Sequence, residues 1–192
     1  MAKGLSAESI TVAAAELIEQ YGRSGFSMRL LADTMGVKTA SLYNHIENMD
    51  TLLTEVCRYA LRMQEDGELR AIAGKTGREA VWALAWAYRR FAQQHRELYW
   101  LVMDTAAGEP RVLDDAAARF TEPLKQVFSG FYLPPREEIH FRRMFRAIVH
   151  GFASQEDEGF FSHYPASTEL SFEFAIQRFI DCVLEAEKRN PS

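Results

Sequence analysis

The sequence predicts an all-α fold, in which an N-terminal three-helix head is joined by a connector helix to a helical-bundle body, with about nine helices in total. Apolar residues recur every three or four positions along most of the 192 residues, which is the period of an amphipathic helix. Glycines and prolines separate these stretches. No strand-like alternation and no internal repeat stands out. We expect residues 1–48 to form the head and residues 49–192 the body.

Composition narrows the possible classes of protein. The chain is 47% hydrophobic, enough for a sizeable core, and its net charge of −5 argues against coating nucleic acid through bulk electrostatics. Its longest apolar runs, such as residues 80–88, fall well short of the roughly 20 residues that span a bilayer. The first residues have no signal-peptide pattern, so a cytoplasmic location is expected. Cys57 and Cys182 lie far apart, which favours two free thiols over a disulfide.

The first predicted helix runs from Ser6 to Tyr21. Ser6 is a suitable N-cap, and the carboxylate of Glu8 favours the positive end of the helix. Gly22 and Gly25 then predict its end. The apolar residues of this helix share one face, so we expect them to form the core on which the rest of the head packs.

Residues 26–46 predict two short helices that meet at a tight turn. Ser27 would cap the first helix, and Gly36 would supply the left-handed backbone that ends it. The second helix is predicted from Lys38 to His45, with Leu42 pointing inward. Its other face is short, polar and of a size that enters the DNA major groove, with Lys38, Thr39, Ser41, Tyr43 and Asn44. An ordinary helical hairpin is the alternative for this pattern alone.

The body follows as a series of helices. The connector is predicted over residues 50–64, and a transition rich in glycine and charge over residues 65–78. The later predicted helices cover residues 79–95, 97–104, 112–131, 135–153 and 167–188. Loops are expected at residues 106–110 and 156–166. Pro123 is expected to kink or break the helix in which it lies, and Pro135 to begin the next one.

Three segments of the first third resemble the TetR family of one-component transcriptional regulators: GFSMRLLADTMGV, the LYNHI ending, and the helix that opens NMDTLL. The rest of the chain resembles the family in helical character and length. Residues 149–161, VHGFASQEDEGFF, also resemble the late-helix signature of a subgroup named for a Trp-His-Gly tripeptide, with Val149 in place of the Trp. The resemblance implies a homodimeric, ligand-responsive DNA-binding regulator. We expect a repressor that releases a palindromic operator when a small hydrophobic or aromatic effector binds the C-terminal domain.

The resemblance also assigns roles to residues of the head. Those expected to meet bases are Lys38, Thr39, Ala40, Ser41 and Asn44. Those expected to hold phosphates are Ser27, Arg29, Tyr43 and His45. Glu47 and Met49 occupy positions where the family commonly presents basic residues to the DNA backbone. Binding to DNA is therefore expected to depend on Lys38, on uncharged donors and on dimerisation.

In the body, the resemblance implies an effector pocket and a dimer interface. Large aromatic side chains on converging helices favour a pocket, and the expected lining is Trp86, Tyr99, Met103, Phe128, Met144 and His150. The last two long helices carry broad apolar stripes that would pair with those of a second copy. The expected interface residues are Phe152, Phe172, Ile176, Phe179, Ile180 and Val183. Packing within a single core is the alternative explanation of these stripes.

The sequence gives no support for a metal, a cofactor or catalysis. Glu137 and His140 have the ExxH spacing of carboxylate-bridged di-iron bundles, but such a site needs a second ExxH, and the chain has none. No nucleophile elbow, phosphate-binding glycine loop or dinucleotide fingerprint occurs. The expected partners are a double-stranded DNA operator, a small-molecule effector and a second copy of the chain, without a membrane. The alternative is a helical-bundle interaction module, or a small-molecule or metal-binding protein, that does not recognise DNA sequence.

Overall fold

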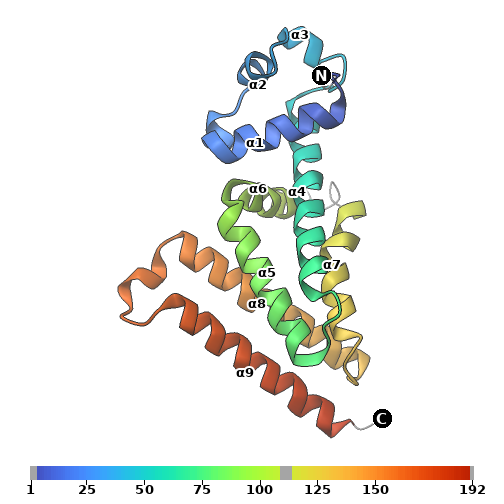
Figure 1. The fold of residues 1–192 in the computed structure, drawn as a ribbon, viewed down its shortest axis with the longest axis vertical. Coiled ribbons are helices and arrows are strands. Elements are labelled where there is room, and N and C mark those ends of the chain that lie inside the picture. The colour runs from blue at the N-terminus through green and yellow to red at the C-terminus, as the bar shows by residue number, and fades with distance from the viewer. Residues whose placement is uncertain (1–3, 109–113, 191–192) are drawn as a thin grey trace. The chain divides into compact units, whose positions relative to one another are not determined.

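The computed structural model of the protein describes residues 4–108 and 114–190, and the side chains of all of these except 106–108 and 114–120. Within these ranges the regular structure is entirely helical, which confirms the predicted all-α class (Figure 1). The helices are α1 (Ala7–Gly25), α2 (Met28–Met35), α3 (Thr39–Leu42), α4 (Met49–Ile72), α5 (Gly77–Gln94), α6 (Arg96–Gly108), α7 (Asp114–Phe128), α8 (Pro135–Asp157), the 3-10 helix η2 (Phe160–His163) and α9 (Thr168–Arg189).

The chain forms two compact units by packing. The first comprises residues 1–63 and 95–119, and the second comprises residues 64–94 and 120–192. Helix α4 therefore contributes its first part to one unit and its last part to the other. Packing and function divide a chain by different criteria, so the functional boundary after residue 48 stays a prediction.

The first unit is built on α1, which packs against both α2 and α6. Ser6 and Ser9 form a capping box at the start of α1, and the helix kinks at Gly22, whose φ of 72° suits a residue without a side chain. One further turn follows the kink, so α1 ends later than predicted. The Glu19 carboxylate of α1 accepts a hydrogen bond of 2.9 Å from the backbone N–H of Leu98, in the first turn of α6. This bond satisfies a donor that α6 itself leaves open.

A buried ion pair joins two helices of the second unit. The guanidinium of Arg89 on α5 donates from Nε to Glu156 on α8 at 3.0 Å, and a second bond joins Nη2 to the other carboxylate oxygen. The same guanidinium lies 5.1 Å from the ring centre of Trp86 and 4.9 Å from that of Phe172 on α9. Cation–π contacts of this kind strengthen when water is excluded, and Arg89 is only 6% exposed. One side chain thus links α5, α8 and α9.

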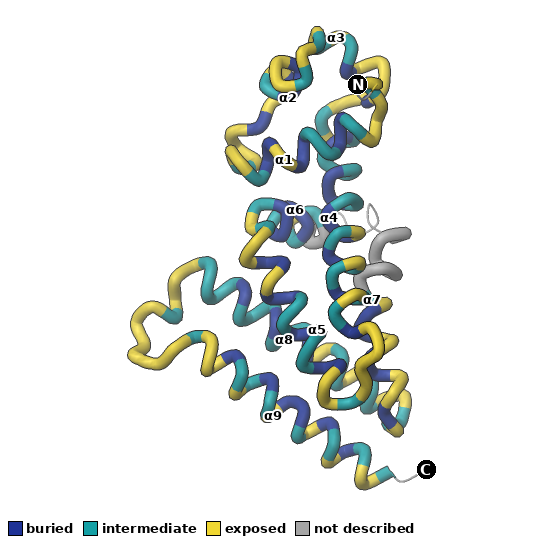
Figure 2. The backbone as a smooth tube through the Cα atoms, viewed as in Figure 1, coloured by how far each residue is buried: buried dark blue, intermediate teal, exposed yellow. Residues whose placement is uncertain are grey.

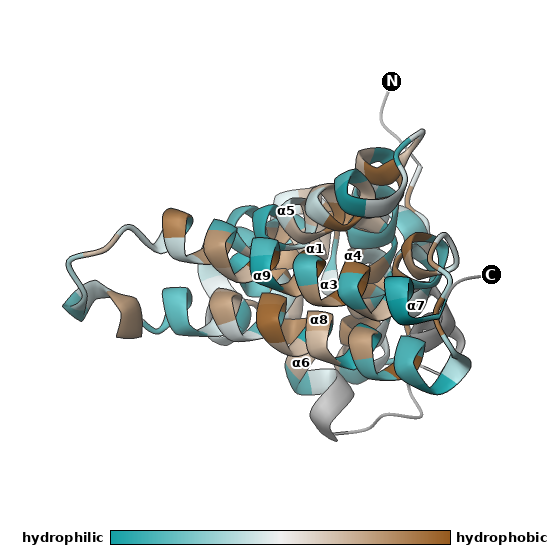
Figure 3. Ribbon diagram, turned by 90° about the horizontal axis from the view of Figure 1, so that it is seen from below, coloured by the Kyte–Doolittle hydropathy of each residue, from teal (hydrophilic) through white to brown (hydrophobic). Residues whose placement is uncertain are grey.

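Burial and hydropathy follow the helical period in this unit. Along α9 the buried residues are Phe172, Ile176, Phe179, Ile180, Val183 and Ala186 (Figure 2). Bands of hydrophobic and hydrophilic residues alternate along the helices, as expected for amphipathic packing (Figure 3). The connection from α8 to α9 is mostly exposed.

Several predicted boundaries are wrong. The α-helical part of the reading helix ends at Leu42, and a turn replaces its last residues. Helix α4 continues to Ile72, through the region predicted as a transition. Helix α6 continues to Gly108, so its end overlaps the expected loop, the rest of which lies outside the described residues. Pro123 lies inside α7 without ending it, and α8 runs to Asp157.

The described parts of the chain, residues 4–108 and 114–190, contain neither a membrane-spanning helix nor a cluster of metal-binding side chains. No helix there is long and apolar enough to cross a membrane. The same residues contain no group of three or more His, Cys, Asp or Glu placed to hold a metal ion.

The Arg89–Glu156 pair yields a stability prediction. Replacing Glu156 by Ala leaves a buried guanidinium without its carboxylate and should lower the free energy of unfolding by about 3 kcal/mol. Urea denaturation followed by circular dichroism, at one fixed protein concentration, measures the change. Glu158→Ala is the control, because Glu158 is exposed two residues further on and its loss should cost about 0.5 kcal/mol or less. Equal midpoints for the two variants would contradict the role given to the pair.

Candidate functional site

The turn between α2 and α3 has the geometry predicted for a helix-turn-helix. Ser27 caps α2 by accepting a hydrogen bond of 3.1 Å from the N–H of Leu30. At the other end Gly36 is left-handed, with φ 68° and ψ 30°. The N–H of Val37 then donates to the carbonyl of Ala32 at 3.0 Å, and the N–H of Gly36 donates to that of Asp33 at 3.2 Å. These two bonds form a Schellman motif, which fixes the direction in which the chain enters α3.

Helix α3 is short and is anchored by one side of its surface. Leu42 is fully buried and Ile46 nearly so. The carbonyl of Leu42 accepts hydrogen bonds from the N–H groups of His45 at 2.9 Å and of Ile46 at 3.0 Å, which closes the turn after the helix. Anchoring through Leu42 leaves the opposite side of α3 and this turn facing solvent.

The residues predicted to contact DNA lie in α2, in α3 and in the segments that flank them. Seven are exposed: Ser27, Arg29, Lys38, Ala40, Tyr43, Asn44 and His45. Thr39 and Ser41 are half-buried. This arrangement presents short polar side chains and one aromatic hydroxyl around Lys38, with Arg29 on α2 and His45 in the turn after α3. The assignment of these nine residues to bases and phosphates stays a prediction.

The charge of this surface is modest. Arg29 lies 3.9 Å from Asp33, and both side chains are largely exposed, so the pair contributes little. The side chain of Asn48 caps α4 by accepting from the N–H of Thr51 at 2.9 Å. The N–H groups of Met49 and Asp50 have no acceptor within their own helix, as at every helix start. They are the backbone donors that a phosphate at this helix end would meet.

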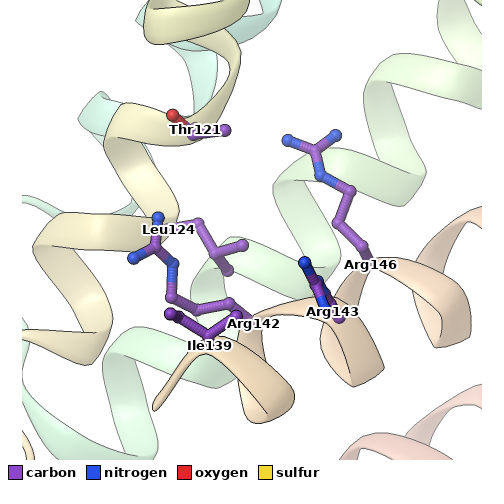
Figure 4. A pocket seen from close by; sticks show the side chains of 6 residues that line it. All are labelled: Thr121, Leu124, Ile139, Arg142, Arg143 and Arg146. Atoms are coloured by element: carbon purple, nitrogen blue, oxygen red, sulfur yellow. The ribbon is translucent and has the colours of Figure 1, made fainter. Parts of the chain in front are cut away.

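A pocket of about 320 Å³ lies between α7 and α8 in the second unit (Figure 4). Its lining from α7 includes Thr121 and Leu124. Its lining from α8 is the row Ile139, Arg142, Arg143 and Arg146. Figure 4 shows Arg142 and Arg146 extending from α8 toward the side on which Thr121 and Leu124 lie. The pocket therefore combines a few aliphatic groups and one hydroxyl with a concentration of positive charge.

An acidic residue lies behind this pocket. Glu68, on the last part of α4, lines a small void of about 10 Å³ together with Arg146 and Leu124, which also line the pocket. Glu68 is 6% exposed and accepts a hydrogen bond of 2.8 Å from Gln64. Burial raises the pKa of Glu68 to about 7, an increase that the Gln64 hydrogen bond and the charge of Arg146 only partly offset. A protonatable carboxyl and an arginine thus share the interior side of the pocket.

None of the six residues predicted to bind the effector is among the described residues that line this pocket. Phe128 is fully buried against Phe131 and Phe179, and Trp86 packs edge-on against Phe172. Met144 is exposed and His150 is half-buried. Burial, followed by the charge of Arg146, lowers the pKa of His150. Tyr99 and Met103 belong to the first unit, where Tyr99 is buried and Met103 half-buried. Their predicted contacts with a ligand stay untested.

Five of the six predicted interface residues are buried in the core of the second unit, and the sixth, Phe152, is half-buried. Phe172, Ile176, Phe179, Ile180 and Val183 are at most 1% exposed in the single chain. Phe152 is half-buried and packs against Phe161 and Phe172. The large apolar side chains that α8 and α9 leave exposed are others: Ile139, Met144, Leu170 and Phe174. A second copy would contact exposed side chains such as these. The predicted residues would lie beneath them and hold them in place.

The sequence does carry a signal for the arginine row, although the prediction above assigns these residues no function. Ile139, Arg142, Arg143 and Arg146 stand at positions i, i+3, i+4 and i+7, so they share one helical face. Three arginines in five positions, with the nearest acid on that face at Glu138, form a local excess of positive charge. What the sequence leaves out is the neighbour, α7, that turns a solvated face into the wall of a pocket.

A turn-linked pair of short helices with an exposed polar face, in a chain whose second unit has a pocket of its own, is typical of ligand-responsive transcriptional regulators. Comparison with known proteins identifies the family. The model of the bacterial regulatory proteins of the tetR family matches residues 10–56, and the model of the tetracyclin repressor-like C-terminal domain matches residues 81–179. The chain therefore belongs to the TetR family, whose members are regulators that bind DNA operators and ligands and form dimers, and are not enzymes.

Individual relatives agree with this assignment. The chain is 27% identical over 186 residues to the HTH-type transcriptional regulator YobS of Bacillus subtilis, with 94% of each chain covered. A solved structure of a protein of unknown function from Rhodococcus has the same fold, with a TM-score of 0.80, 21% identity and 94% and 96% of the two chains covered. The TetR variant Q116A from Acinetobacter baumannii, solved in complex with minocycline, aligns with a TM-score of 0.66, 20% identity and 98% and 100% covered.

The buried carboxyl yields a prediction of pH dependence. The folded chain keeps the Glu68 proton up to a pKa of about 7, whereas an exposed glutamate in the unfolded chain loses it near 4.5. Between these values the folded state binds more protons, so the contribution of Glu68 to stability falls as pH rises and levels off above the folded pKa. Glu68→Gln cannot ionise. Relative to the natural chain, the variant should gain roughly 3 kcal/mol in free energy of unfolding across this window.

Urea unfolding of both proteins at a series of pH values tests this, because titrations elsewhere in the chain cancel in the difference. Parallel stability curves would show that Glu68 titrates normally in the folded protein.

Proposed function

We propose that the protein is a homodimeric repressor whose two heads bind successive major grooves of a palindromic operator and release it when a small effector binds the body. The observation that carries this proposal is the exposed polar face of α3, held at a fixed angle by the Gly36 turn, in a chain of the TetR family. A helix-turn-helix dimer places its two reading helices about 34 to 36 Å apart. As a DNA-binding protein of a bacterial family, it would act in the cytoplasm.

Within the head, the proposed roles follow exposure and chemistry. Lys38, Thr39, Ala40, Ser41 and Asn44 would meet base edges. Ser27, Arg29, Tyr43 and His45 would hold phosphates. Glu47 is exposed and acidic beside this surface, so each head would bind weakly and two heads acting together would be required. Residues 1–48 would form the DNA-binding domain and residues 49–192 the ligand-binding and dimerisation domain.

In the body, α8 and α9 would pair with the same helices of a second copy. Leu170 and Phe174 stand four residues apart on α9 and are 64% and 65% exposed. Large apolar side chains left exposed on one face commonly mark a protein–protein interface. On α8, Met144, Ala147 and Gly151 share another face, where the small residues would allow close approach of a partner helix. Phe152 and the buried residues of α9 would support this surface from within.

The effector would enter the body. One structural relative was solved with minocycline, which supports a small-molecule site in this fold. In the present chain the pocket between α7 and α8 is the candidate, since it is open to solvent and lined by both apolar and charged groups. The effector shifts the protein only if it binds the DNA-bound and free conformations unequally.

Selection from a pool of random duplexes tests the proposed DNA function directly. The full-length protein should enrich one palindromic sequence, and a footprint should cover two half-sites one helical turn apart. Recovery of no common sequence at low salt would reject the proposal. The same experiment supplies the operator needed for the tests that follow.

Lys38 is the sharpest residue to test in the head. Replacing it by Ala should weaken binding to the selected operator about tenfold and lower the slope of affinity against salt by about one ion, because one phosphate or base contact is lost. Fluorescence anisotropy over a salt series measures both. Lys75→Ala is the control, since Lys75 is an exposed lysine that lies between α4 and α5. Identical behaviour of the two variants would remove Lys38 from the interface.

The proposed dimer surface makes a second prediction. Phe174→Glu should convert a dimer at micromolar concentration into a monomer, because a carboxylate buried against the partner would lose its hydration, at a cost that Arg178, whose guanidinium lies 5.4 Å from the ring centre of Phe174, would only partly offset. Sedimentation velocity measures the change. Tyr132→Glu is the control, since Tyr132 is an aromatic residue of similar exposure, 66%, outside the proposed surface. A variant at Phe174 that stays dimeric would place the interface elsewhere.

A further inference from the structure

The pocket between α7 and α8 has a pronounced electrostatic character. Of the described residues that line it, three are arginines and none is acidic. Glu138, one turn before Arg142 on α8, pairs with that arginine at 3.1 Å. Arg143 is exposed beside it. Three guanidinium groups and one paired carboxylate, Glu138, thus stand on this face of α8, so the described part of the lining carries an excess of positive charge.

The other described residues of the lining are aliphatic or carry a hydroxyl group. Leu124 and Ile139 supply apolar surface, and Thr121 supplies a hydroxyl on the α7 side. A volume of about 320 Å³ lies at the small end of the range for ligand sites. The pocket would therefore hold a compact molecule with an apolar part against the aliphatic groups and a charged part against the arginines.

We propose that the effector of this regulator is a small amphipathic organic anion, with one carboxylate or phosphate group bound by Arg142, Arg143 and Arg146 and an apolar body bound by Leu124 and Ile139. This inference rests on the proposed function, because an effector is a ligand that regulates DNA binding. The binding of the anion itself does not depend on DNA. Guanidinium groups bind carboxylate and phosphate oxygens through paired hydrogen bonds, which gives such a pocket its selectivity over neutral and cationic molecules.

Glu68 gives the pocket a link to α4. Glu68 and Arg146 line the same small void, and the charge of Arg146 acts on the Glu68 carboxyl. An incoming anion would compete with Glu68 for the positive charge of Arg146 and would weaken the attraction between α4 and α8. Since the first part of α4 follows directly on the reading helix in the chain, a change at Glu68 acts on the helix that leads to the head. The carboxyl is thus the internal counter-charge that the ligand replaces.

Matched amphiphiles test the proposal with the full-length protein and no DNA. The probes are octanoate, octyl phosphate, octanol and octylamine, which share one chain length and differ in the head group, together with naphthoate and naphthol as an aromatic pair. Isothermal titration calorimetry should show saturable binding of at least one anion, at least tenfold tighter than that of the alcohol of the same body, and none of the amine. A preference between octanoate and octyl phosphate distinguishes the carboxylate from the phosphate source.

Two pocket variants should change the affinity for the anion in opposite directions, and a third variant serves as the control. Arg143→Gln should weaken the bound anion roughly tenfold, because one charged hydrogen-bonding group is lost. At about pH 8, where Glu68 is ionised, Glu68→Gln should tighten it by about threefold, because a competing negative charge is removed. Arg90→Gln is the control: this arginine of α5 is exposed, is not among the lining residues and should leave binding unchanged. A merely disturbed fold would weaken binding in both pocket variants.

The outcomes separate the two proposals. If the anions bind no better than the alcohols, or if Arg143→Gln equals Arg90→Gln, the inference is wrong, whatever the operator selection shows. If anions bind through Arg143 but the selection recovers no operator, the anion site stands and the proposed DNA function fails. If Arg143→Gln instead weakens operator binding and lowers its salt dependence without any effect on the anions, the arginine row contacts DNA and the inference is overturned.

Discussion

The second unit depends on the burial of one guanidinium. Taking the Arg89 charge out of water is costly unless its donors and its charge are both matched, and the match here comes from a carboxylate on α8 and two aromatic rings on α5 and α9. This requirement fixes the rotation of α8 about its own axis. With Glu156, Val149 and Phe145 directed inward, the 3.6-residue period places the row from Ile139 to Arg146 at the border of that inward face. The arginine row therefore meets α7.

The head and the body differ in how far local sequence determines them. In the head, the Ser27 cap, the left-handed Gly36 and the buried Leu42 are short-range signals, and the structure has each of them. In the body, the glycine and charges after residue 64 predict a transition, yet α4 continues. Gln64, Glu68 and Ile72 are buried at successive turns on one face, so packing within the second unit outweighs the low helix propensity of Gly67. The residues that extend α4 past Gly67 are thus on the helices that pack against it, and the local sequence of α4 does not contain this signal.

The same reasoning explains which parts of the site could be predicted. The exposed polar face of α3 follows from its position after the turn. A pocket depends on which faces of separate helices pack together. A sequence predicts the apolar and polar faces of each helix, but it does not predict which faces meet. Aromatic content predicts a pocket lined by Trp86 and Phe128. In the structure Trp86 packs against Trp82 and Phe172, and Phe128 packs against Phe131 and Phe179, so a role of these rings in ligand binding stays a prediction. Polar residues on α8 predict a solvated surface, whereas α7 covers part of it.

Two buried charged groups of the second unit differ in the completeness of their pairing. Arg89 forms a bidentate pair with the Glu156 carboxylate and contacts two aromatic rings, so a further anion would bind it only weakly. Glu68 and Arg146 line one small void, and the charge of Arg146 only partly offsets the burial that raises the pKa of Glu68, so we expect a ligand at Arg146 to alter this interaction. Helix α8 carries the arginine row on one face and the proposed dimer surface on another. A ligand that draws Arg146 outward would act on both α4 and the α8 surface, and the strength of the Arg89 pair would make α8 respond as a rigid body.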